Sequence, residues 1–486
     1  MRLGGSRIAL AVALLAASAM PAYADTLREA LASAYNTNPT LQGARASQRG
    51  VDENVVIERA AGLPAVHGDA SYTEILDDTY SDPGNLYPDR QLSGGLSLTV
   101  PVYSGGAVRN SVRAAKTRVK AGQADLRATE SAIFSQVTAA YMDVILNEAV
   151  VGLNAHLVNV LSVNLQATSD RFEIGDLTRT DVAQSTSRLQ LARGDLRTAQ
   201  ANLVESRERY IRLVGHEPGH LAPPPPLPGL PEQVDEAVTI ALQSNPDLIA
   251  AQERAKASDY DIEVAGATRL PKIELFTSGN VVDTLGSGPL DTLSGTGKDR
   301  TTSATAGVRA TIPLYQGGRP AALERQAQAG SAAALEQQIE IERGVIAQVR
   351  AAYSSWQAAN AIIESSKSGI AAAELSLEGV QAENTVGNRT ILDILDAQQE
   401  LQRARVQLVT AQRNAYVAGF TLLAAMGKAE ARDLGIDTGG PLYDPQDNYR
   451  RVKGKIFDWS FDPDPVAQST RTVDTPAQDG EISASN

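Results

Sequence analysis

The sequence predicts a mainly α-helical chain in which long coiled-coil helices are combined with four β-strands of a membrane β-barrel. Three observations predict this fold class. The chain repeats a unit of about two hundred residues, each unit holds a stretch of two-residue alternation, and each unit then continues with a seven-residue hydrophobic period.

The N-terminus predicts export from the cytoplasm. Residues 1–24 contain two arginines, an apolar run at Ile8–Met20 and a small-residue cleavage site at 22–24, which together are typical of a signal peptide. The run is too short to span a bilayer. We therefore expect the mature chain to begin at Asp25, which changes the formal net charge from −13 to −15 because both arginines are removed. An acidic exported chain is a poor candidate for binding nucleic acid.

The duplication defines the predicted domain organisation. Residues 25–222 form the first repeat, a proline-rich linker follows at 223–231, and residues 232–430 form the second repeat. The matched positions are 207 residues apart at first and 212 apart after the strands: Asn38 and Asn245, Pro64 and Pro271, Tyr103 and Tyr315, Tyr141 and Tyr353, Gly175 and Gly387, Asp181 and Asp393. Because this unit is too long for a solenoid repeat, we interpret it as a duplicated half-domain.

Each repeat is expected to begin with two helices and two strands. The first helices, Leu27–Asn36 and Gln233–Ser244, end at Asn-Pro pairs, because a residue before proline is disfavoured in the α region. The strands are predicted at about 64–77, 91–101, 272–282 and 301–313. Within 92–100 and 303–312, apolar or small residues alternate with polar or small ones, which is the period of a half-exposed strand. The loops at 78–90 and 283–300 are rich in turn-forming residues and are predicted to be exposed tips.

Long helices are predicted for the rest of each repeat, at 106–174, 180–214, 318–384 and 390–427. Apolar residues recur every seven positions in all four, and a second ladder of alanine and serine follows three positions later in the two shorter ones. Sustained heptads predict coiled-coil packing, and small residues allow a close approach of the helices. At ~1.5 Å per residue, the first of these helices is roughly 100 Å long.

Four strands cannot form a closed barrel within one chain. An open sheet in hydrocarbon would leave backbone groups unpaired, at a cost of several kcal/mol each, so other copies must complete it. Two copies would give a barrel filled by side chains, whereas three would give twelve strands and room for a lumen, and we favour three for that reason. The alternation alone is a modest signal, and a soluble α+β protein is the alternative interpretation of the strands.

Specific motifs resemble the TolC family of trimeric outer-membrane channel-tunnels. They are Val102-Tyr103-Ser104-Gly105-Gly106, its counterpart Leu314-Tyr315-Gln316-Gly317-Gly318, and the run from Val386 to Ala397. The resemblance covers about residues 25–430 and implies a trimeric twelve-stranded barrel in outer-membrane lipid with a helical tunnel in the periplasm. It also implies export of small molecules or proteins together with a periplasmic adaptor and an inner-membrane transporter of the ABC, RND or MFS type. The last of the three motifs is most similar to the type I secretion and multidrug branch.

Asp393 and Asp396 are the predicted pore constriction. They lie three residues apart at the start of a helix and so share one face. In a trimer they would become six carboxylates around one axis, a ring that favours cations and whose members raise one another's pKa values. The pattern Thr390-Ile391-Leu392-Asp393 also fits a helix-capping box. The pattern alone favours capping, the resemblance implies a constriction, and the two roles are compatible.

The resemblance also implies a gating network and adaptor-contact turns. The gating network, which would hold the inner end of the tunnel shut, is Arg389, Asp181, Thr180 and Asn384. Asn384 stands where the family's best-known closed forms have tyrosine, and its side chain reaches less far. The turns expected to contact an adaptor are Gly175, Asp176, Leu177, Gly387 and Asn388. Helix-end capping and an ordinary helix–helix turn are the alternative interpretations of these residues.

No catalytic site, cofactor or metal site is predicted. The chain has no cysteine, which excludes disulfides, thiol catalysis and a lipidated N-terminal cysteine. Its four histidines are scattered, and Pro218 and Gly219 break any helix that would align His216 with His220. After the signal peptide no stretch of 18 consecutive apolar residues predicts a transmembrane helix. Residues 431–486 are predicted to be a polar, largely disordered tail. A soluble periplasmic coiled-coil adaptor or scaffold remains the alternative function, whereas a simple porin has too little helix to fit.

Overall fold

The computed structural model describes residues 25–76, 88–287 and 300–482. The predicted signal peptide at 1–24 and most of the predicted loops at 78–90 and 283–300 lie outside the described residues.

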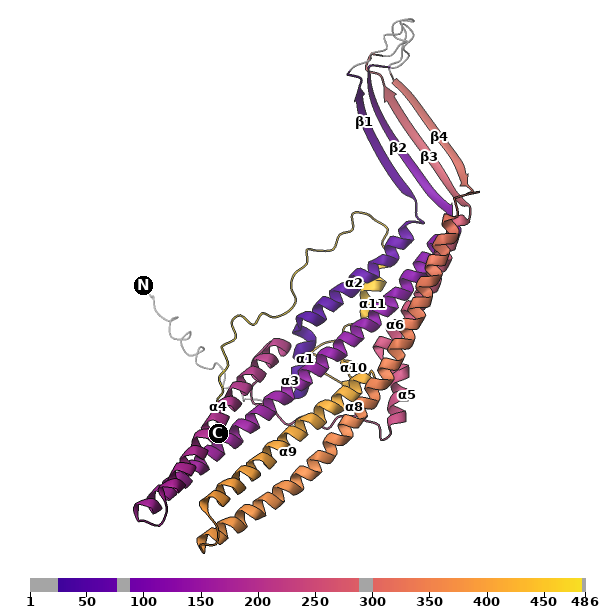
Figure 1. Ribbon diagram of the computed structural model, residues 1–486. Helices are drawn as coiled ribbons and strands as arrows, with labels where there is room; N and C mark the ends of the chain where they lie inside the picture. The colour runs from indigo at the N-terminus through magenta and orange to yellow at the C-terminus, as the bar shows by residue number, and fades with distance from the viewer. Residues whose placement is uncertain (1–24, 77–87, 288–299, 483–486) are drawn as a thin grey trace, which may run out of the picture.

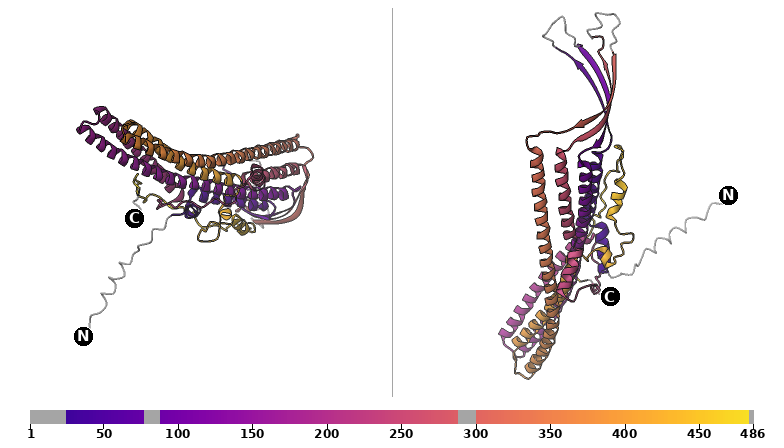
Figure 2. Two further views of the ribbon diagram at one scale, coloured as in Figure 1. Left: turned by 90° about the horizontal axis from the view of Figure 1, so that it is seen from below. Right: turned by 90° about the vertical axis from the view of Figure 1, so that its right-hand side faces the viewer.

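The protein is a long bundle of helices with a small sheet at one end (Figure 1). Two helical hairpins, α3–α4 and α8–α9, extend from the middle of the bundle to the opposite end, where each makes a tight turn. The helices of the first repeat are α1 (Leu27–Thr37), α2 (Pro39–Ala60), α3 (Ala107–Glu173) and α4 (Arg179–Val214). Those of the second are α5 (Val234–Ser244), α6 (Pro246–Gly266), α8 (Arg319–Thr385) and α9 (Ile391–Ala425). Figure 2 shows that the helices form a curved layer rather than a solid cylinder.

The Asn-Pro pairs make the same joint in both repeats. Asn38 and Asn245 cap α2 and α6, and each is followed by proline at the first helical position, where a missing N–H has no cost. The Asn38 amide donates to the carbonyl of Leu213 at 3.0 Å, and the Asn245 amide donates to the carbonyl of Ala425 at 2.9 Å. Each asparagine therefore links the start of its repeat to the end of the last long helix of that repeat.

The four strands form one antiparallel sheet in the order β1-β2-β3-β4. Their bounds are β1 (Ala65–Glu74), β2 (Arg90–Tyr103), β3 (Lys272–Asp283) and β4 (Arg300–Thr311). The two repeats meet where β2 pairs with β3, and β1 and β4 are left as the two edges. The predicted combination of four strands with long helices is thus confirmed.

The register gives the sheet one apolar and one polar face. Val66 of β1 pairs with Leu98 of β2, and Val308 of β4 pairs with Leu275 of β3, so these side chains lie on one face. The other face has hydroxyl and charged pairs across the strands: Ser71 with Ser93 at 2.8 Å, Ser278 with Thr305 at 2.8 Å, and Arg309 with Glu274 at 2.7 Å. Such a sheet suits a wall between lipid and water.

The hydrophobic core lies in the middle of the molecule, where the short helices pack on the long ones. Tyr141 of α3 is buried there, and its hydroxyl donates to the carbonyls of Asp25 and Ala222 at 2.8 and 2.6 Å. The equivalent Tyr353 of α8 donates to the carbonyl of Glu232 at 2.5 Å. The repeated tyrosines hold Asp25 and the residues flanking both ends of the linker against the bundle.

The C-terminal segment differs from the expected disordered tail. It contains α10 (Ala431–Leu434) and α11 (Pro445–Val452), and it then follows an extended path along the outside of the bundle (Figure 1). Asn448 of α11 donates to the fully buried carboxylate of Asp52 at 2.8 Å. Specific partners of this kind stabilise a segment whose polar composition suggested disorder.

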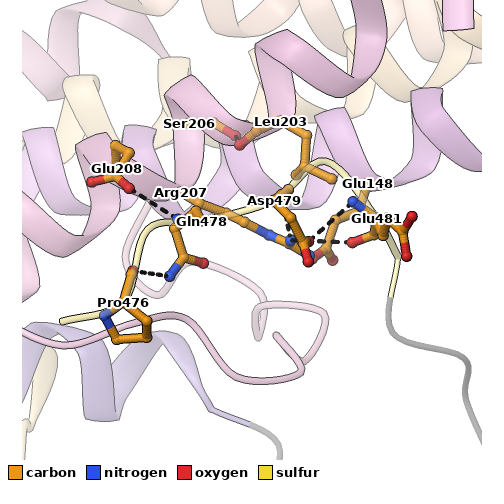
Figure 3. A network of polar contacts seen from close by, with 9 residues as sticks. All are labelled: Glu148, Leu203, Ser206, Arg207, Glu208, Pro476, Gln478, Asp479 and Glu481. Carbon is orange, nitrogen blue, oxygen red and sulfur yellow. Dashed lines mark hydrogen bonds and ion pairs between the residues drawn. The ribbon is translucent and has the colours of Figure 1, made fainter. Parts of the chain in front are cut away.

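The end of this segment is held by a buried arginine of α4. Figure 3 shows Arg207 between the tail and α3: it donates to the carbonyls of Asp479 and Glu481 at 3.0 and 3.1 Å and pairs with Glu148 at 3.0 Å. Because Arg207 is largely buried, these acceptors compensate the lost hydration of its charge.

Among the described residues, α3 alone is long and apolar enough by composition to cross a membrane. One such helix is weak evidence for a span. This one has 67 residues, about three times the ~20 that a span needs, and it packs along α4 and α6.

Candidate functional site at the helical tips

The two hairpin turns, at Gly175 and Gly387, are built alike. These glycines have φ of +84° and +83°, a left-handed conformation that side chains with a Cβ rarely adopt. The following amides close the ends of the helices, since Asp176 N–H donates to the Arg171 carbonyl at 2.9 Å and Asn388 N–H to the Glu383 carbonyl at 3.0 Å. The glycine therefore fixes the tight turn in each repeat.

The next helices both begin with a capping box. The side chain of Thr178 accepts from the amide of Asp181, and the Asp181 carboxylate accepts from the Thr178 hydroxyl and amide at 2.7 and 2.9 Å. Thr390 and Asp393 make the same contacts at the same distances. The capping interpretation of both aspartates thus agrees with the structure.

These caps also set the charge of the aspartates. Hydrogen bonds from the Thr178 side chain and backbone lower the pKa of Asp181, and those from Thr390 lower the pKa of Asp393. Asp393 is therefore firmly ionised at neutral pH. The lowered pKa of Asp393 within one protomer is opposite to the raised pKa expected for a crowded ring of carboxylates. That rise would come from charges on neighbouring protomers.

The two tips each have an ion pair, but the order of the positive and negative residues along the chain is reversed. In the first, Arg171 at the end of α3 binds Asp176 at 2.6 Å. In the second, glutamate replaces the arginine, and Glu383 binds Arg389 at 2.7 Å. Arg389 also lies 3.9 Å from the Asp393 carboxylate. The second tip thus places a guanidinium beside the predicted constriction.

Asn384 acts inside its own turn. Its side-chain amide donates to the backbone carbonyl of Arg389 at 2.7 Å. The two predicted gating residues Arg389 and Asp181 have separate partners within this protomer, and no contact between them occurs among the residues that the structure describes. Thr180 is exposed on the first turn of α4.

Asp396 makes a contact that sequence reasoning did not find. Arg188 of α4 donates to its carboxylate at 2.5 Å and to the side-chain oxygen of Gln399 at 2.7 Å. The side chains of Arg188 and Asp396 are 31% and 57% exposed. This pair joins the first repeat to the second. Arg188 lies seven residues after Asp181, on the same face of α4, and this spacing was the available signal.

A small apolar cluster of α3, α4 and α9 residues packs next to the tips. Leu395 of α9 is buried against Leu161 of α3 and Leu189 and Ala192 of α4. One helical turn later, Gln398 accepts from the amide of Asn164 at 3.0 Å. Leu395 stands between the two aspartates in sequence and its side chain fills this apolar cluster, so Asp393 and Asp396 lie outside the cluster.

Comparisons with known proteins agree with this architecture. The family model described as outer membrane efflux protein matches residues 30–216 and 237–428, one block in each repeat. The outer membrane efflux protein BepC of Brucella suis is 33% identical over 440 residues, which are 90% of this chain and 92% of that protein. The outer membrane protein TolC of Vibrio cholerae is 26% identical over 85% of this chain and 93% of its own. The crystal structure of the Campylobacter jejuni CmeC outer membrane channel superposes with a TM-score of 0.72 at 17% identity, covering 88% of this chain and 89% of CmeC.

Proposed function

Because this chain belongs to the outer membrane efflux protein family, we propose that three copies of it form one closed channel that works with a periplasmic adaptor and an inner-membrane transporter. The chain is an outer-membrane channel of the efflux and secretion type that extends into the periplasm, and its family consists of transport proteins rather than enzymes. Members of the family work with adaptors and inner-membrane pumps. The number of copies, the class of pump and the residues that gate the channel are parts of the proposal.

The proposal of a trimer rests on the two open edges of the sheet. β1 and β4 each pair on one side only among the described strands, and the apolar face of the sheet is exposed. In a bilayer those edges need partners. Since β1 and β4 run in opposite directions, the β4 edge of one copy can pair antiparallel with the β1 edge of the next. Three copies give the twelve strands that can surround a lumen.

The tips supply the proposed constriction and gate. Three copies would place Asp393 and Asp396 around one axis, with an Arg188 beside each Asp396. Such a ring favours cations, and Arg188 would moderate its charge. Arg389, Asp181, Thr180 and Asn384 would form the contacts that keep neighbouring tips together, beyond the capping contacts they make within a protomer. The turns at 175–177 and 387–388 would be the surface that an adaptor contacts.

Cross-linking of the two edge strands tests the assembly. Val66 of β1 and Val308 of β4 lie on the apolar face near the helical end of the sheet and are 70% and 66% exposed. Since the chain has no cysteine, Val66→Cys and Val308→Cys introduce the only thiols. We expect a short bismaleimide to give covalent trimers with the double variant. Each single variant is the control and should give no trimers, because like strands are not neighbours in the ring. Monomers alone, or ladders beyond three copies, would contradict the proposal.

A further inference from the structure

The chain leaves α11 close to the start of the sheet. Asn448, in the middle of α11, contacts Asp52 of α2, and the carbonyls of Lys453 and Lys455 accept from Arg59 at 2.5 and 3.4 Å. α11 thus runs alongside α2 and in the same direction, toward the sheet (Figure 1). α2 ends at Ala60 and β1 begins at Ala65. The residues that directly follow 455 therefore lie outside the bundle, close to the level where the sheet begins (Figure 2).

These residues form a loop that is closed at its base. Asp462 accepts from both terminal nitrogens of Arg451 at 2.7 Å and from Lys455 at 3.3 Å. These hydrogen bonds, chiefly those from Arg451, lower the pKa of Asp462. A turn brings the Ser460 amide to 3.2 Å from the Phe457 carbonyl. Residues 456–461, which lie between Lys455 and Asp462 at the base and contain this turn, are called the aromatic loop below.

The apolar side chains of the aromatic loop point into solvent. Ile456, Phe457, Trp459 and Phe461 are 72%, 71%, 75% and 78% exposed. The whole chain has only six phenylalanines and two tryptophans, so this loop concentrates residues that are otherwise scarce. Elsewhere Phe134 and Phe420 are buried. Large apolar groups held in solvent by an ordered loop indicate a surface that something covers.

We propose that the aromatic loop inserts into the periplasmic leaflet of the outer membrane and anchors the helical bundle to the phospholipid surface. The loop is close to the part of the chain expected to meet lipid, because it lies near the level where the sheet begins and on the outside of the bundle. Its composition fits that position, since tryptophan and phenylalanine are favoured where apolar lipid meets polar headgroups. The contacts of Asp462 with Arg451 and Lys455 hold the loop in place before insertion, so little conformational entropy is lost when it inserts.

The two tryptophans provide a matched pair of reporters. Trp356 of α8 packs edge-on against Tyr353, with ring centroids 5.9 Å apart. It lies ~55 Å along α8 from the end of that helix nearest the sheet, at ~1.5 Å per residue. Trp356→Phe leaves Trp459 as the only tryptophan, and Trp459→Phe leaves Trp356. Neither substitution removes a residue of the tips.

Quenching in a bilayer tests the proposal. The full-length assembled protein is placed in phospholipid nanodiscs with or without a headgroup spin-labelled phosphatidylcholine. We expect the label to quench Trp459 at least twofold more than Trp356, and we expect iodide in the buffer to quench Trp459 weakly. Equal lipid quenching of both would overturn the proposal. Strong iodide quenching of Trp459 would overturn it in favour of a solvated loop, and protection from both quenchers would overturn it in favour of coverage by protein. None of these outcomes depends on whether the channel has three copies.

Discussion

Arg188 offers a sharp test of how the tips are held, because its contact joins the two repeats next to the proposed constriction. The guanidinium binds Asp396 at 2.5 Å and Gln399 at 2.7 Å, and Arg188→Ala removes both contacts. If α4 and α9 separate when the channel opens, the pair stabilises only the closed arrangement. The substitution should then favour opening without unfolding the tip, since Leu395 stays buried behind it.

The size of the effect follows from the exposure of the pair. At 31% and 57% exposure, water and salt screen the charges, so one pair is worth about 0.5–1 kcal/mol. Three copies would lose about 1.5–3 kcal/mol of closed-state stability, which is roughly a 10- to 150-fold change in the open-to-closed ratio. High salt should shrink the difference between the variant and the parent protein.

Single-channel recording in planar bilayers measures this ratio. We expect Arg188→Ala and Asp396→Asn each to raise the open fraction, and the double variant to add little, because both remove one interaction. Arg193→Ala is the matched control, since Arg193 is exposed five residues further along α4 and has no ion pair among the described contacts. If Arg188→Ala behaves like Arg193→Ala, the reasoning is refuted.

Four further predictions concern the same tips. Asp393→Ala with Asp396→Ala should move the reversal potential in a KCl gradient toward zero; an unaltered potential would exclude the pair from the constriction. Because the cap lowers the folded-state pKa of Asp393, its capping contribution is complete above the ordinary carboxyl range and is lost as pH falls through the lowered value, so the loss of thermal stability caused by Asp393→Asn at neutral pH should shrink on acidification. Arg389→Ala or Asp181→Ala should raise single-channel conductance, and unchanged conductance in both variants would count against the gating network. Gly387→Val, at φ +83°, should weaken adaptor cross-linking and export more than basal conductance, and full export would remove that turn from the contact surface.

Local patterns explain what the sequence could predict. The duplicated Asn-Pro pairs, the alternation around Leu96 and the heptads are short-range signals, and each reports the local backbone directly. The capping box at Thr390 was visible for the same reason, since it occupies four consecutive residues. These features were sufficient to predict the helices, the strands and the turns that form the tips.

Contacts between distant residues explain what could not be predicted. Arg188 and Asp396 are 208 residues apart, and only the fold brings α4 beside α9. The C-terminal segment was expected to be disordered because it is polar. Its order comes from particular pairs, such as Asn448 with Asp52, that are 396 residues apart. Composition measures the average apolar content of a segment and carries no information on such pairs.

Counting the chains in the membrane-extracted assembly tests the central claim most directly. The claim is that one protomer supplies four strands of a wall that neighbouring copies close. Native mass spectrometry of the protein released from detergent micelles should give a mass of three chains and no stable monomer. A detergent-free, water-soluble monomer with the full helix and strand content by circular dichroism would contradict the account.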